Sequence, residues 1–150
     1  MIIWIASYPK SGNTWVRSFL SSYIYSEGKA FNFEMLFEKI TQFPSQSLFN
    51  QMGQNPKNLL EAAQSWISTQ EMINLSNDND IVFLKTHNAM CKIENYPFTN
   101  KENTLGAIYI VRDPRDVLVS YHAHSVTKTN NANYTSVLDT MTTGKTLTYL

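Results

Sequence analysis

The chain opens with a strand, a tight loop and a helix, and this succession restricts its fold more than any other feature. Residues 2–6 read Ile-Ile-Trp-Ile-Ala, and residues 8–15 read Tyr-Pro-Lys-Ser-Gly-Asn-Thr-Trp before an amphipathic helix. This arrangement turns backbone N–H groups and a helix N-terminus toward an anionic group. Lys10 adds a mobile positive charge, and Ser11 and Thr14 add hydroxyl donors. The pattern therefore predicts a phosphate-binding cradle.

The cradle differs from the common nucleotide-binding loop. That loop reads G-x-x-x-x-G-K-[ST], with the lysine after the second glycine. Here Lys10 precedes Gly12, which is the only glycine of a shorter loop. We therefore expect a phosphate cradle of another class. A kinase-type phosphotransferase is a weaker alternative, because the first two predicted strands do not end in an obvious carboxylate for Mg²⁺.

Strands alternate with helices along the rest of the chain. Apolar runs predict strands at residues 81–84 and 107–111, and apolar periodicity predicts helices over residues 33–40 and 56–73. A further helix is expected over residues 134–141. Such alternation implies parallel crossover units with ligands at the carboxyl ends of the strands. We predict a three-layer α/β fold of the P-loop nucleotide-binding type, with a parallel sheet that is incomplete in this chain.

Local signals refine these elements. The first helix carries Trp15, Phe19 and Tyr23 on one stripe, which is the usual mark of an inward-facing side. The segment at residues 44–56 is rich in Gln, Asn and Ser, and is predicted to be a surface loop. Asp113 stands directly before a proline, so we expect it to cap a helix that begins at that proline.

Composition and charge exclude several classes of function. Twelve Lys and Arg residues balance twelve Asp and Glu residues, so no net field favours nucleic acid or an anionic membrane, and any anion site must be local. Cys91 is the only cysteine, which excludes an internal disulfide and fits a reducing compartment. The N-terminal apolar run is too short for a signal peptide or a membrane span. We expect a cytoplasmic protein without nucleic-acid or membrane partners.

Three sequence blocks together resemble the sulfotransferases, which use 3′-phosphoadenosine 5′-phosphosulfate (PAPS) as the sulfuryl donor. The Pro-Lys-Ser-Gly-x-Thr-Trp run is similar to their 5′-phosphosulfate loop. Residues 84–87, Leu-Lys-Thr-His, resemble the segment that carries their catalytic histidine. Residues 108–121 are similar to their 3′-phosphate segment, R-[DN]-P-[RK]-D-x-x-x-S-Y. The blocks occur in the family's order, each after a predicted strand, and the resemblance extends from Met1 to about Tyr121.

The resemblance implies that PAPS is the co-substrate, that no metal takes part, and that the donor contacts two separate segments. Asn13 stands where the family more often has threonine, and its amide keeps a donor for the same contact. Trp15 would stack on adenine, with ordinary core packing as the alternative. Arg112 would bind the 3′-phosphate unless Asp113 or Asp116 pairs with it. The implied donor-binding residues are Lys10, Ser11, Gly12, Asn13, Thr14, Trp15, Arg112 and Ser120.

Sulfuryl transfer needs preorganised positive charge and a general base, because charge grows on the bridging oxygen while the acceptor loses a proton. Lys10 is our candidate for the charge and His87 for the base, since an imidazole titrates near neutrality. Lys85 can supply a second cation. The plainer alternatives are a solvated lysine at either position and a polar residue at the end of a strand. His122 and His124 receive no role, because the family's segment does not require histidine there.

The family's last donor-binding segment, R-K-G-x-x-G-D-W-K, is missing from the sequence. No two glycines are three positions apart among Gly12, Gly28, Gly53, Gly106 and Gly144. We interpret residues 1–150 as the N-terminal part of a sulfotransferase domain, acting on a hydroxyl or amine of a small-molecule or glycan acceptor. The alternative is a truncated, non-catalytic module that binds adenosine 3′,5′-bisphosphate. The sequence predicts neither the acceptor's identity nor the oligomeric state.

Overall fold

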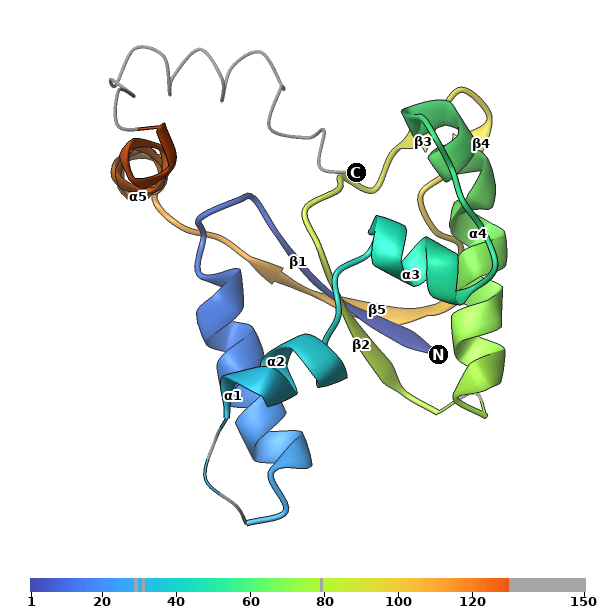
Figure 1. The fold of residues 1–150 in the computed structure, drawn as a ribbon, viewed down its shortest axis with the longest axis horizontal. Coiled ribbons are helices and arrows are strands. Elements are labelled where there is room, and N and C mark those ends of the chain that lie inside the picture. Colours follow the sequence, from blue (N-terminus) through green and yellow to red (C-terminus); the bar gives the residue numbers. More distant parts are fainter. Residues whose placement is uncertain (29, 31, 79, 130–150) are drawn as a thin grey trace.

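A parallel sheet organises the chain in the computed structural model, which describes residues 1–28, 30, 32–78 and 80–129. The central strand β1 (Ile2–Ser7) lies between β2 (Val82–Thr86) and β5 (Thr104–Ile110), and both pairings are parallel (Figure 1). The three strands predicted from apolar runs are thereby confirmed, with bounds that differ by a few residues. Their carboxyl ends meet at one edge of the sheet, as the parallel prediction requires.

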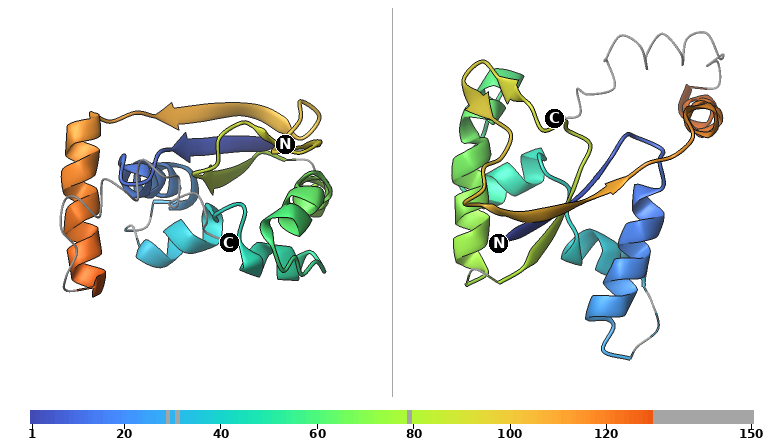
Figure 2. Two further views of the ribbon diagram at one scale, coloured as in Figure 1. Left: turned by 90° about the horizontal axis from the view of Figure 1, so that it is seen from above. Right: turned by 180° about the vertical axis from the view of Figure 1, so that it is seen from behind.

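Helices lie on both faces of this sheet. Figures 1 and 2 show α1 (Asn13–Tyr25) and α2 (Phe33–Lys39) on one face, and α3 (Gln46–Gln51) and α4 (Leu59–Ser76) on the other. The last described helix, α5 (Pro114–Thr129), stands beyond the carboxyl ends of the strands. This arrangement is the predicted three-layer α/β fold, with a sheet of three strands in the described part of the chain.

The main apolar core lies between the sheet and α4. Four aromatic rings, Trp4, Phe43, Trp66 and Phe98, pack against one another with centroids 5.1 to 5.8 Å apart. All four side chains are buried. Trp4 Nε1 also donates a hydrogen bond to Thr104 Oγ1 at 2.8 Å. This bond satisfies the polar atom of a core tryptophan and ties β1 to β5.

The predicted surface loop at residues 44–56 contains the short helix α3, so that prediction is wrong. Ser45 caps the helix, because its hydroxyl accepts a hydrogen bond from the Leu48 N–H at 3.3 Å. Leu48 and Phe49 then enter the core. A helix of six residues with one apolar pair is too short to display a helical period, and the polar residues around the pair hide it.

Two further differences concern short or unplaced elements. The strands β3 (Lys92–Ile93) and β4 (Tyr96–Pro97) form an antiparallel pair beside α4 and were not predicted, because two residues carry no period. The helix expected over residues 134–141 lies outside the described residues.

The inward face of α1 is polar, contrary to the expectation from its aromatic stripe. Positions two apart point to opposite sides of a helix, because each residue turns the chain by about 100°. Two rows of residues on opposite sides of α1 have the same spacing, so either row could face the core. The helical period alone does not decide which of them does. The row that is buried consists of Asn13, Arg17 and Ser21. The exposed row consists of Trp15, Phe19 and Tyr23, whose rings stack at centroid separations of 6.3 and 6.2 Å.

Candidate functional site

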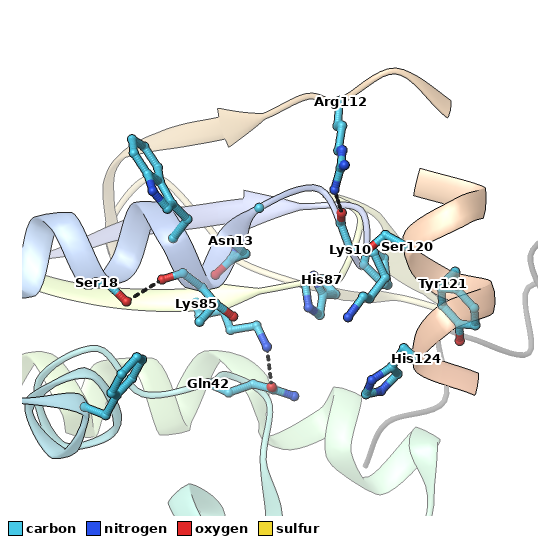
Figure 3. Close-up of a pocket in the computed structure, with 15 residues that line it drawn as sticks. Lys10, Asn13, Ser18, Gln42, Lys85, His87, Arg112, Ser120, Tyr121 and His124 are labelled. Carbon is cyan, nitrogen blue, oxygen red and sulfur yellow. Dashed lines mark hydrogen bonds between the residues drawn. The ribbon is translucent and has the colours of Figure 1, made fainter. Parts of the chain in front are cut away.

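A cavity of about 740 Å³ opens at the carboxyl ends of the parallel strands (Figure 3). The loop after β1, the end of β2 and the segment that runs from β5 into α5 all contribute to its wall. Ser11 is buried in the loop behind this wall. The other predicted site residues line the cavity, namely Lys10, Gly12, Asn13, Thr14, Trp15, Lys85, His87, Arg112 and Ser120.

The lining of the cavity is basic. Lys10, Lys85 and Arg112 contribute cations, and His87 and His124 contribute imidazoles. No Asp or Glu belongs to the lining in the part of the chain that the structure describes. A cleft of one charge sign concentrates its field and attracts an anion, even though the chain's formal net charge is +0. The basic lining agrees with the prediction that any anion site must be local in a chain whose acidic and basic residues balance.

The loop between β1 and α1 presents the start of a helix to the cavity. Lys10 and Gly12 both have positive φ, at 67° and 99°, and the Ser11 N–H donates to the Tyr8 carbonyl oxygen at 3.3 Å. Glycine adopts this backbone region readily, whereas a lysine stays there only when its surroundings hold it. No side chain caps the first turn of α1. Its N–H groups can therefore bind an anion.

Asn13 fastens this loop to β1 instead of offering its amide to the cavity. Its Nδ2 donates to the Ile5 carbonyl oxygen at 3.0 Å and to Ser7 Oγ at 3.1 Å, and the residue is 5% exposed. The expected contact between the Asn13 amide and a donor is therefore replaced by a contact with β1. What Asn13 can offer a ligand is its backbone N–H at the start of α1.

Replacing Asn13 with alanine should lower the free energy of unfolding by about 1–3 kcal/mol. The substitution leaves the Ile5 carbonyl and the Ser7 hydroxyl without this donor in a buried place. Urea unfolding of the purified chain measures the effect. Thr14→Ala is the matched control, because Thr14 is exposed on the same turn and should change stability by less than about 0.5 kcal/mol. An Asn13→Ala effect as small as the control's would contradict the structural role.

Trp15 stands at the rim of the cavity with its indole accessible. The residue is 74% exposed, and its ring stacks on Phe19 with an interplanar angle of 9°. The alternative of core packing is therefore wrong for Trp15. An exposed indole face beside an anion-binding loop is a suitable surface for an aromatic base. Stacking on adenine stays a prediction.

His87 follows β2 and has one ring nitrogen fixed by β1. Its Nδ1 lies 2.8 Å from the Ser7 carbonyl oxygen, which can only accept, so Nδ1 carries the hydrogen. Nε2 is then the nitrogen that can take up a proton. Burial lowers the pKa of His87 below its usual value, the charges of Lys85 and Arg17 lower it further, and the bond to Ser7 opposes them. These effects together favour the neutral form of the imidazole.

Lys85 is held at the cavity wall and is not a freely solvated strand-end lysine. Its Nζ donates to Gln42 Oε1 at 2.9 Å (Figure 3). The backbone of Lys85 also pairs with residues 41–43, donating to Thr41 and accepting from Phe43, each at 2.8 Å. Burial, with a contribution from Arg17, lowers the pKa of Lys85 to about 8. The amine keeps most of its positive charge at pH 7.

Arg112 and Ser120 face the same cavity, as a shared phosphate contact requires. Arg112 Nη1 donates to the Lys10 carbonyl oxygen at 3.2 Å, which links the segment after β5 to the cradle (Figure 3). The carboxylate of Asp116 lies 3.9 Å from Arg112 Nε, at the limit of an ion pair, and both side chains are partly exposed. Exposed ion pairs of this kind contribute about 0–1 kcal/mol to stability. The guanidinium of Arg112 is therefore still accessible to an anion of higher charge, such as a phosphate.

Asp113 caps α5, as predicted. Its Oδ1 accepts a hydrogen bond from the backbone N–H of Arg115 at 2.9 Å. The Arg115 guanidinium also bonds to this carboxylate, with Nη2 2.6 Å from Oδ2, and these contacts lower the pKa of Asp113. The carboxylate is thereby occupied by Arg115. Asp113 is therefore not the partner of Arg112, and that alternative is wrong.

Several lining residues were not singled out from the sequence. Ser18 and His124 each follow an assigned residue by four positions in a helix, so the spacing of helical faces could have found them. Gln42 follows α2, where no local pattern points to the cavity. Phe33 belongs to an aromatic cluster whose sequence fits either an apolar pocket or ordinary core, and the structure places it in the cavity lining. The complete set of additional lining residues is Pro9, Ser18, Phe33, Gln42, Tyr121 and His124.

Two kinds of feature are absent from residues 1–28, 30, 32–78 and 80–129. No group of three or more His, Cys, Asp or Glu side chains there is arranged to hold a metal ion. No helix in this part of the chain has the length and apolarity needed to cross a bilayer.

Comparison with known protein families matches the chain to the family described as Sulfotransferase domain, over residues 2–148. The match includes the cradle, the end of β2 and the segment that leads into α5. A search of curated proteins found no match. The family match therefore covers the same three blocks that meet at the cavity.

Proposed function

This chain belongs to the sulfotransferase domain family, and we propose that it moves a sulfuryl group from PAPS to a hydroxyl or amine acceptor. Sulfuryl transfer is the chemistry of that family. The finer proposal is supported above all by one observation. Three cations and a neutral imidazole from separate motifs line one cavity whose described lining has no carboxylate.

Two segments would hold the donor. The uncapped first turn of α1 and the side chains of Lys10 and Thr14 suit the 5′-phosphosulfate, because N–H groups at a helix start and a nearby cation favour a multiply charged anion. Arg112 and Ser120 suit the 3′-phosphate, since guanidinium and hydroxyl groups both donate to phosphate oxygens. The accessible indole of Trp15 supports stacking with adenine.

In the proposed reaction His87 activates the acceptor and Lys10 stabilises the leaving group. The acceptor oxygen or nitrogen forms a bond to sulfur, and its proton passes to Nε2 of His87. The bond between sulfur and the bridging oxygen breaks, so that adenosine 3′,5′-bisphosphate leaves with the electron pair. The positive charge of Lys10 opposes the charge that grows on this oxygen. Lys85, held by Gln42, would add a second cation to the same wall.

The acceptor would approach from the side of the cavity opposite Arg112. Figure 3 shows Arg112 on one side of His87, with Gln42 and His124 on the other. That side combines an amide and an imidazole, which suits a polar acceptor group such as the hydroxyl of a small molecule or glycan. A cytoplasmic location, and the lack of nucleic-acid and membrane partners, stay predictions.

The proposal is tested by a sulfuryl-transfer assay with labelled PAPS and a panel of hydroxyl and amine acceptors. A calorimetric titration with adenosine 3′,5′-bisphosphate runs beside it on the same preparation. Labelled product, together with saturable binding of the bisphosphate, is the expected result. Binding without transfer would favour the alternative of a non-catalytic module that binds adenosine 3′,5′-bisphosphate. Magnesium-dependent hydrolysis of a nucleoside triphosphate, without bisphosphate binding, would contradict both.

Arg112→Ala or Ser120→Ala should weaken donor binding without removing the chemistry. We expect a roughly tenfold or larger rise in the KM for PAPS after loss of the Arg112 contact, because a charge-assisted hydrogen bond contributes about 1.5–3 kcal/mol. The preference for adenosine 3′,5′-bisphosphate over adenosine 5′-monophosphate should also fall, as measured by calorimetry. Arg115→Ala is the control, since Arg115 is exposed and engaged with Asp113. An unchanged preference would refute the 3′-phosphate assignment.

A further inference from the structure

Arg17 is a charged residue that is buried close to the cavity without a carboxylate partner. It lies on the inward face of α1 and is 5% exposed. Its Nη2 donates to the carbonyl oxygen of Leu36 at 3.1 Å and to that of Ile40. Within the described part of the chain, no Asp or Glu forms an ion pair with it. Burial lowers the pKa of the guanidinium to about 10, so it stays charged at neutral pH.

Such a group costs free energy unless something compensates it. Buried charges are usually paired, and an apolar side chain of similar size is often more stable at the same place. The two carbonyls lie at the C-terminal end of α2, which carries partial negative charge and offsets part of the cost. Neither carbonyl bears a full charge. The positive charge of Arg17 is therefore not neutralised. In the protein interior it interacts with neighbouring charged groups more strongly than it would in water.

Arg17 is also connected to the cavity wall through the backbone. Ile40, which accepts from Arg17, directly precedes residues 41–43. This segment pairs with β2 at Lys85, and its Gln42 side chain accepts the hydrogen bond from Lys85 Nζ. A guanidinium that fixes Ile40 therefore also fixes the segment that holds Lys85.

We propose that Arg17 is a positioning residue that keeps His87 unprotonated and holds Lys85 at the cavity wall. The inference deepens the proposed function and rests on it, because a general base must be neutral to accept a proton. Burial and the charges of Lys85 and Arg17 together lower the pKa of His87. No carboxylate in the described lining offsets them. The other charged or titratable groups of the cavity are Lys10, Arg112, Tyr121 and His124.

The test is a histidine NMR titration of the unliganded chain, which needs neither donor nor turnover. His87→Gln assigns the resonance, and wild-type His87 should titrate below the usual value of about 6.5. Arg17→Gln keeps N–H donors for the two carbonyls but removes the charge. It should raise the midpoint of the His87 titration, because one of the positive charges that oppose protonation is lost. Arg17→Lys keeps the charge and should leave the midpoint near that of the wild type.

Arg115→Gln is the matched control, because it removes one positive charge from an exposed arginine outside the cavity lining. It should leave the His87 midpoint unchanged. An equal midpoint in wild type and folded Arg17→Gln would overturn the proposal, as would an Arg17→Lys shift as large as that of Arg17→Gln. If Arg17→Gln does not fold, a wild-type midpoint at or above about 6.5 overturns it. The expected shift in a chain without transfer activity would support this inference and contradict the proposed function.

Discussion

Replacing His87 with alanine should reduce sulfuryl transfer by about 10²–10⁴-fold, the range typical for loss of a general base. The imidazole is set up for this role, because its Nδ1 is bonded to the Ser7 carbonyl and its Nε2 can accept a proton. Affinity for adenosine 3′,5′-bisphosphate should be nearly unchanged, since the start of α1 and Arg112 are untouched. Steady-state kinetics and a calorimetric titration on the same variant measure the two effects.

The pH dependence of kcat/KM provides a second readout for His87. The pKa of His87 is lowered, so the neutral base persists further into acid than an unperturbed histidine. Activity of the wild type should therefore fall only as the pH drops below about 6.5, and this acid limb should be absent from the residual activity of His87→Ala. His122→Ala is the matched control, because His122 lies outside the lining. Near-normal turnover in folded His87→Ala would leave His87 as a polar residue at the end of a strand.

The strands could be predicted from the sequence because parallel strands covered on both faces read as continuous apolar runs. β1 and β2 show this pattern, and the three-layer fold follows from their alternation with helices. Short elements could not be found in this way. The helix α3 places its apolar pair, Leu48 and Phe49, in the core only because Ser45 starts a helix there.

The inward face of α1 could not be predicted, because hydrophobicity pointed to the wrong row. Trp15, Phe19 and Tyr23 are exposed, while Asn13 and Arg17 are buried. Both buried side chains donate hydrogen bonds to specific oxygens: Asn13 to oxygens of β1, and Arg17 to carbonyl oxygens at the end of α2. Partners on other elements become visible only once those elements have been packed.

The candidate site was predictable to the extent that it depends on loops at strand ends. Lys10, His87 and Arg112 each follow a strand, and parallel pairing brings such positions to one edge. The contacts that set their chemistry were not predictable. The bond between Lys85 and Gln42 joins residues 43 positions apart, and nothing in either local sequence indicates it.

Lys10→Ala should lower sulfuryl transfer by about 10²–10³-fold, the loss typical for removal of one group that stabilises a developing oxyanion. Affinity for adenosine 3′,5′-bisphosphate should fall by a much smaller factor. The reason is that Lys10 would face charge that appears only as the sulfuryl group leaves, and such interactions contribute to kcat more than to binding. Single-turnover kinetics measure the chemical step, and calorimetry measures the product affinity.

This substitution is a clean probe of the Lys10 side chain. The bond from Arg112 goes to the Lys10 backbone carbonyl and should survive. Alanine has the same Cβ as lysine, so the positive φ of 67° costs a similar amount in both. Lys101→Ala is the control, because Lys101 is exposed and lies outside the lining. If transfer and product affinity fell by the same factor, Lys10 would bind ground state and transition state alike, and its proposed role at the leaving group would be wrong.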